Sequence, residues 1–197
     1  MLKHSVLAVF CSFALLSACE PNANESMEPV PRDPPGAVHQ EGGKKEDQSG
    51  GGEPAESDST IIIALSEINT WRQAGCDCGD EAKPAAEKVT WNAKLYAAAL
   101  AHAKDMNTKS YFSHTSLSGE NVYHRLVQSG YISGTSSVLA YGENIAFGNF
   151  DLKGAVQKWL GSPSHCANIM RNSYREMAIA HDGKYWVQVF GTRRDSK

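Results

Sequence analysis

A histidine and a cysteine stand side by side near the end of this 197-residue sequence, in the stretch SPSHCANIM from Ser162 to Met170. His165 and Cys166 could act as a catalytic base and its nucleophile, as two metal ligands, or as neighbours with separate roles. Adjacent residues on a helix or tight turn point about a quarter-turn apart, so they do not easily reach one substrate atom. We therefore expect separate roles.

Two further cysteines precede this pair in the part of the chain expected to fold, Cys76 and Cys78. Thiols outside the cytoplasm tend to oxidise, and an odd count leaves one cysteine over. Cys76 and Cys78 are too close for an easy mutual bridge, so one of them should pair with Cys166. That bridge would close a loop of about 90 residues, which the chain-entropy model values at about 4 kcal/mol. A zinc site made of Cys76, Cys78 and His165 is an alternative, although C-x-C is not the usual structural zinc spacing.

Several function classes have little support in the sequence. There is no HExxH, no GxSxG and no convincing catalytic triad, so an enzymatic activity has little local support. The segment 60–197 carries fifteen Lys and Arg against twelve Asp and Glu, and no basic stripe interleaved with aromatic residues. This composition argues against nucleic acid as a partner.

The first eighteen residues read as a targeting signal. Lys3 is followed by an apolar run from Val6 to Leu16, which is too short for a permanent membrane span but suits a secretory signal. The end of this run, LSAC from Leu16 to Cys19, resembles the lipobox of bacterial lipoproteins. The resemblance implies cleavage before Cys19 and acylation of that cysteine. We therefore expect a protein that is lipid-anchored to a bacterial membrane, outside the cytoplasm, with residues 1–18 removed.

A tether follows the anchor over residues 19–59. From Glu20 to Ser59 there is no aromatic residue, six of the eight prolines fall here, and ten acidic residues face three basic ones. Such a segment cannot bury enough apolar surface to offset the entropy of ordering. We interpret it as a disordered spacer, and 60–197 as one domain.

The domain must position its polar residues with a mixed set of elements. Helices are predicted over 59–75, 90–110, 119–130 and 151–162, with Ser59 or Thr60 capping the first and Thr90 the second. Asp182-Gly183 between two apolar runs indicates a β-hairpin, and 138–148 reads as a further strand. On the second helix, His102 is expected to be a hydrogen-bonded core histidine. Helices before and after a small sheet predict an α+β layered sandwich.

Five motifs in a fixed order resemble one family. These are YFSHTS (Tyr111–Ser116), GENIAFG (Gly142–Gly148), WLGSPSHCANIM (Trp159–Met170), YREMAIA and YWVQVFG. Together they are similar to the CAP superfamily of cysteine-rich secretory proteins, antigen 5 and pathogenesis-related 1 proteins, over essentially all of 61–192. The resemblance implies a three-layer α-β-α sandwich with a small antiparallel sheet and a cleft on one side.

The resemblance also implies a site made of His114, Glu143 and His165, which converge in the cleft of the family. Two imidazoles and a carboxylate suit a divalent metal such as zinc, a proton relay, or a polar ligand head group. Many relatives have a second cleft glutamate, but the corresponding stretch here, WLGS, contains no acid. Asn144 and Asn168 are expected to tie loop backbone groups together.

The same resemblance favours Cys78 over Cys76 as the partner of Cys166 in a disulfide. Three functions remain open at this point. The first, which we favour, is a binding module that holds a lipid or another envelope component in the cleft. The others are a zinc-assisted hydrolase or peptidase, in which Glu143 activates water, and an interaction protein that acts through its surface.

Overall fold

The computed structural model describes residues 57–133 and 137–194. The expected signal, Cys19 and nearly all of the tether lie outside these residues. The described chain forms helices and strands in the order α1 (Asp58–Ala74), β1 (Cys76–Cys78), β2 (Glu81–Lys83), β3 (Thr90–Trp91), α2 (Ala93–Lys109), α3 (Val122–Gln128), β4 (Ser137–Phe147), α4 (Leu152–Leu160), α5 (Pro163–Ile169), β5 (Glu176–Asp182) and β6 (Tyr185–Arg194).

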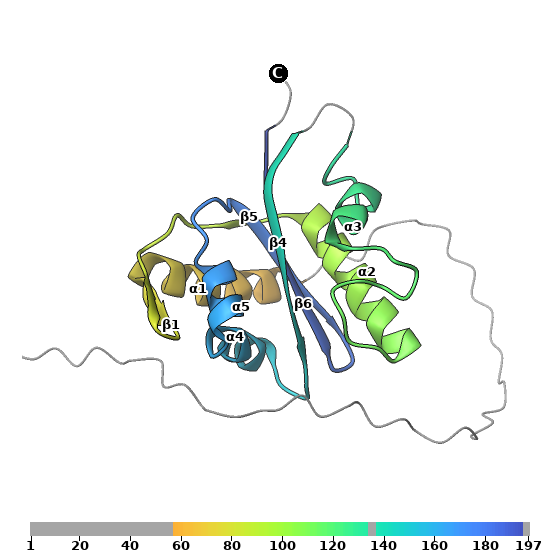
Figure 1. Ribbon diagram of the computed structural model, residues 1–197, viewed down its shortest axis with the longest axis horizontal. Coiled ribbons are helices and arrows are strands. Elements are labelled where there is room, and N and C mark those ends of the chain that lie inside the picture. The colour runs from red at the N-terminus through yellow and green to blue at the C-terminus, as the bar shows by residue number, and fades with distance from the viewer. Residues whose placement is uncertain (1–56, 134–136, 195–197) are drawn as a thin grey trace, which may run out of the picture.

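A four-stranded sheet separates two layers of helices (Figure 1). Its strand order is β3-β5-β6-β4, with α2 and α3 on one face and α1, α4 and α5 on the other. The three-layer α-β-α sandwich is therefore confirmed, and the predicted hairpin joins β5 to β6, with Gly183 and Lys184 as its turn residues and Asp182 paired with Tyr185. The sheet is antiparallel except for the two-residue β3, which pairs parallel with β5. The strands β1 and β2 form a separate hairpin that packs against α5.

The two layers bury two separate cores because the central strands alternate their side chains. On β5, Met177 and Ile179 join the core beneath α1, α4 and α5, whereas Ala178 joins the core beneath α2. On β6, Phe190 joins the core beneath α1, α4 and α5, and Val189 joins the core beneath α2. Successive strand residues point to opposite faces, and helices on both faces make both sets apolar.

A fully buried arginine anchors α1 to the segment that follows α5. Arg72 donates from Nε to the carbonyl of Glu87 (2.7 Å), from Nη1 to those of Ile169 (2.6 Å) and Arg171 (3.0 Å), and from Nη2 to that of Tyr174 (3.4 Å). Burial lowers the pKa of Arg72 to about 10, so it stays charged at neutral pH. Its role is to satisfy carbonyls of a loop that contributes to the cleft.

Candidate functional site

The edge strand β4 places two consecutive polar residues on opposite sides of the sheet. Glu143 points toward α2 and α3, while Asn144 points toward α5. This follows from the two-residue period of a strand. Gly142 precedes them because a Cβ at this position would overlap the Tyr174 hydroxyl. The GEN motif therefore puts one polar side chain into each half of a cleft that spans the sheet edge.

Glu143 is a buried carboxylate with a different partner at each oxygen. Its side chain is 3% exposed. Oε1 accepts from Nδ1 of His114 at 2.9 Å, and Oε2 accepts from Nη2 of Arg125 at 2.8 Å. The charge of Glu143 is thus paired with that of Arg125, a buried residue of α3. A buried acid that is both ion-paired and hydrogen-bonded is held in one orientation.

His114 lies on the loop after α2, and Glu143 orients its ring. Because its Nδ1 donates to Glu143, its Nε2 carries the lone pair, and the side chain is 55% exposed. Arg125 also donates to the His114 carbonyl at 2.9 Å, which fixes the loop backbone. A carboxylate that accepts from one ring nitrogen in this way fixes the orientation of the imidazole.

His102 supports this loop from the core, as a hydrogen-bonded core histidine should. Its Nε2 donates to the carbonyl of Ser113 at 2.9 Å and lies 4.0 Å from Oε1 of Glu143. Burial lowers the pKa of His102, so the ring is neutral at neutral pH. His102 positions the residue before His114 and does not reach solvent.

On the other side of β4, amide side chains tie α5 to the strand. Asn144 donates from Nδ2 to the His165 carbonyl (3.3 Å) and to Oε1 of Gln188 (2.9 Å). Asn168 donates from Nδ2 to the Glu143 carbonyl (3.2 Å) and to Oδ1 of Asn144 (2.9 Å). Both asparagines hold backbone groups, as expected from the sequence. They fix α5, which carries His165, against the sheet edge.

These segments enclose a cleft of about 460 Å³ that contains both histidines and the glutamate of the predicted site. The lining is mostly polar or charged and consists of Lys83, His114, Glu143, Asn144, Ser164, His165, Ala167, Asn168, Met170 and Arg171. His165 is partly buried, and burial together with the neighbouring His114 lowers its pKa. The structure thus brings the three predicted residues to one cleft.

Positive charge prevails in this cleft. Lys83 and Arg171 contribute two cations, although Lys83 also pairs with the exposed Glu81. The single acid of the lining, Glu143, is already paired with Arg125. A cleft whose lining has more cations than acids, together with hydrogen-bond donors, attracts anions.

The three residues are not gathered as a compact metal site in this structure. Both oxygens of Glu143 accept hydrogen bonds, one from His114 and one from a guanidinium, so this acid is held as the orienting partner of His114. Among the described residues, only Cys76, Cys78 and Cys166 form a group of three or more His, Cys, Asp or Glu ligand atoms within 4.8 Å of one another. His114, Glu143 and His165 therefore do not form a compact three-ligand set.

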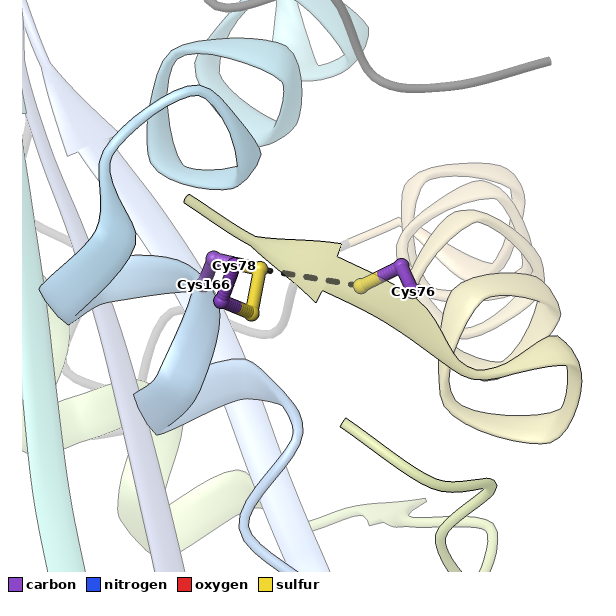
Figure 2. A group of neighbouring side chains, drawn as sticks. All are labelled: Cys76, Cys78 and Cys166. Carbon is purple, nitrogen blue, oxygen red and sulfur yellow. Dashed lines mark hydrogen bonds between the residues drawn. A yellow bond between two sulfur atoms is a disulfide. The ribbon is translucent and has the colours of Figure 1, made fainter. Parts of the chain in front are cut away.

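The cysteines lie on the far side of α5 from the sheet (Figure 2). Cys78 of β1 and Cys166 of α5 form a disulfide with a Cα–Cα distance of 5.4 Å, the same pair that the resemblance favours. His165 and Cys166 thus have separate tasks, one in the cleft and one in a covalent link between α5 and β1. Because Cys78 is bonded to Cys166, the alternative zinc set of Cys76, Cys78 and His165 is not formed.

Three contributors to the site were missed in the sequence. Arg125 reads there as one charged position of an exposed helix, yet it is the counter-ion of Glu143. Lys83 and Arg171 belong to no motif and reach the cleft only because the β1–β2 hairpin and the loop after α5 fold toward it. No local pattern marks any of them.

Fold and site define a class of protein, an α-β-α sandwich with a polar cleft at one sheet edge that holds two histidines and a buried glutamate. Residues 65–190 match the model of the cysteine-rich secretory protein family, CAP. This match covers more than half of the chain, and the chain belongs to the CAP family. Within the described residues, no helix is both long and apolar enough to cross a membrane.

Two curated relatives come from Bacillus subtilis (strain 168), and both are described as uncharacterized. The membrane protein YlbC is 31% identical over 103 residues, which cover 52% of this chain and 28% of YlbC. The protein YkwD is 24% identical over 140 residues, which cover 69% of this chain and 52% of YkwD. The chain thus spans about half or less of the length of these relatives.

Solved structures share the fold at low sequence identity. An outer surface protein from Borrelia burgdorferi has a TM-score of 0.56 at 21% identity, covering 73% of this chain and 99% of its own. An extracellular protein containing a SCP domain from Bacillus anthracis str. Ames has a TM-score of 0.52 at 21% identity, covering 71% of this chain and 45% of its own. These similarities show the fold alone.

Proposed function

We propose that this CAP domain is a binding module whose cleft takes the anionic head group of an envelope component. The observation that carries the proposal is the charge balance of the cleft. Lys83 and Arg171 line it, although Lys83 also pairs with the exposed Glu81, and its single acid, Glu143, is paired with Arg125. His114 and His165 add hydrogen-bonding groups to the same cleft. A phosphate or carboxylate is the chemistry that such a lining recognises.

Exposed aromatic side chains near the cleft suggest that the ligand has an apolar part next to its anionic head group. Tyr141 lies two residues before Glu143 on β4, so both point to the same side of the strand. Its ring contacts Tyr123 of α3 with centroids 6.1 Å apart, and the two are 40% and 42% exposed. Amphipathic rings of this kind suit the boundary between a polar head and an apolar tail. A lipid is the ligand that combines both features.

The proposed location is the outer side of a bacterial membrane, with acylated Cys19 as the anchor and residues 19–59 as the spacer. The signal pattern of residues 1–18 and the LSAC motif support this placement. Two relatives of the same fold are named an extracellular protein and an outer surface protein. A tethered domain at the membrane surface would meet lipid head groups directly.

Binding of short-chain lipids to the purified chain tests the proposal by calorimetry. We expect a soluble phosphatidylglycerol to bind at least about tenfold more tightly than a phosphatidylcholine of equal chain length. Both lipids carry a phosphate, but the choline cation cancels its charge and is repelled by Lys83 and Arg171. The variant Lys83→Gln/Arg171→Gln should lose this preference. The matched control, Lys88→Gln/Lys104→Gln, removes two exposed lysines outside the cleft and should retain it.

Two further experiments distinguish a lipid head group from free phosphate, and cleft binding from an interaction through the surface. Inorganic phosphate that competes with the lipid would assign the affinity to the head group alone, whereas no competition would assign a share to the acyl chains. Equal binding of both lipids, or a preference that survives the double variant, would contradict the proposal. Partners that crosslink in intact cells after both cleft histidines are replaced would favour a protein that acts through its surface.

The zinc-assisted hydrolase has less support from the same geometry. A general base must accept a proton from water, but Glu143 is 3% exposed and accepts from His114 and Arg125. Glu143 instead orients His114, whose side chain is 55% exposed and can hydrogen-bond a ligand in the cleft.

A further inference from the structure

Three sulfur atoms meet where β1 packs against α5 (Figure 2). Cys76 and Cys78 are two residues apart on a strand, so their side chains share one face, and Cys166 of α5 lies against that face. All three sulfurs lie within 4.8 Å of one another, and Sγ of Cys76 is 3.6 Å from Sγ of Cys166. The third cysteine therefore stands in contact with the disulfide.

We propose that Cys76, Cys78 and Cys166 form a thiol–disulfide exchange site in which Cys166 changes partner between Cys78 and Cys76. The thiol of Cys76 loses its proton to solvent, and the thiolate attacks Sγ of Cys166. The Cys76–Cys166 bond forms as the Cys78–Cys166 bond breaks, and the electron pair stays on Sγ of Cys78, which takes up a proton. No oxidant or reductant is consumed.

Cys166 is the sulfur that the geometry favours as the point of attack. The alternative, attack on Cys78, would join two residues of one extended strand, whereas a Cys76–Cys166 bond joins two elements already in contact. Exchange requires the Cys76 side chain to rotate until its sulfur lies opposite the leaving Cys78 sulfur.

The exchange has two physical consequences. Cys76 is partly exposed whereas Cys78 is 3% exposed, so the thiol moves from an accessible position to a buried one. The anchor point on β1 moves by two residues, about 6.6 Å along a strand. Lys83, the strand partner of Cys76, and His165, the neighbour of Cys166, both line the cleft. The bond change would therefore alter how two walls of the cleft are joined.

Disulfide mapping of the purified full-length protein tests the proposal. The protein is incubated at mildly alkaline pH without reductant, quenched with acid, alkylated and digested with an enzyme that cleaves before aspartate. Such cleavage before Asp77 places Cys76 and Cys78 on different peptides. We expect both bridges, Cys76–Cys166 and Cys78–Cys166, with alkylated Cys78 accompanying the first.

Variants give the decisive comparison. Cys76→Ser should retain Cys78–Cys166 and lose all alkylation of Cys78, while Cys78→Ser should contain a Cys76–Cys166 bridge. Wild-type protein in which only Cys76 is alkylated at every pH and time would overturn the proposal, because this result does not depend on how any variant folds. A Cys78→Ser protein that is folded by circular dichroism but has an alkylated Cys166 would overturn it as well.

Discussion

At the scale of single residues, the ion pair between Glu143 and Arg125 organises one half of the cleft. Arg125 neutralises the acid and holds the His114 carbonyl, while the acid orients the His114 ring. The sequence motif identified the histidine and the glutamate correctly as neighbours through resemblance. The resemblance left the role of Glu143 open, and in the structure this acid is hydrogen-bonded to His114 and paired with Arg125 of α3, which no motif marks.

Replacing Glu143 by glutamine tests this assignment. We expect Glu143→Gln to lower the free energy of unfolding by about 3 kcal/mol, because Arg125 is left as a buried charge without its counter-ion. Urea denaturation measures the change. The control Glu120→Gln alters an acid that binds only Ser118 and Gln128 through its side chain and should cost less than about 1 kcal/mol. Equal losses for the two variants would refute the structural role of the pair.

At the scale of elements, the sequence predicted where helices lie in the chain more accurately than where they begin and which of their residues are buried. The first helix begins one residue before its predicted range, with Ser57 as its cap, and it buries Ala64, Ile68 and Arg72. The apolar positions Ile61, Leu65, Ile68 and Trp71 predict this face in part. Ile68 is buried, and Leu65 and Trp71 pack partly buried against the same core. A buried arginine is invisible to such a pattern, because its hydrogen bonds reach carbonyls up to 102 residues away in sequence.

The start of α2 was also misplaced, which yields a second prediction. Thr90 was expected to cap this helix but belongs to β3, and Asn92 caps it by accepting from the backbone N–H groups of Lys94 (2.9 Å) and Leu95 (3.3 Å). Asn92→Ala should therefore cost about 1 kcal/mol or more in urea unfolding, and Thr90→Ala clearly less. Asn92→Ser keeps an accepting side-chain oxygen without adding a charge beside Glu176, to which Asn92 donates at 2.7 Å, and should recover part of the loss. A greater loss of unfolding free energy for Thr90→Ala would show that Thr90, and not Asn92, caps the helix.

At the scale of the whole molecule, the sandwich itself was predictable because its strands and hairpin have clear local signals. The charge of the cleft was not, because its lining comes from the β1–β2 hairpin, the loop after α2, β4, and the region of α5. Only the folded chain brings Lys83 and Arg171 beside the predicted histidines. The disulfide adds a link that the layers themselves do not provide.

Reduction of the Cys78–Cys166 bond should weaken the whole domain. The bond joins residues separated by 88 positions, so the chain-entropy model predicts a loss of about 4 kcal/mol of unfolding free energy. Urea titrations with and without a phosphine reductant measure it. Cys76→Ser should respond like the wild type, and Cys166→Ser should not respond at all. An unchanged wild-type titration would show that the bond contributes nothing.

The cleft spans the border between two independent hydrophobic cores, with His114 attached to one helical layer and His165 to the other. A ligand that bonds both imidazoles would link the two helical layers across the edge strand β4. In a domain under tension, such a contact across both layers would raise the force needed to separate them, so ligand occupancy and mechanical stability would rise together.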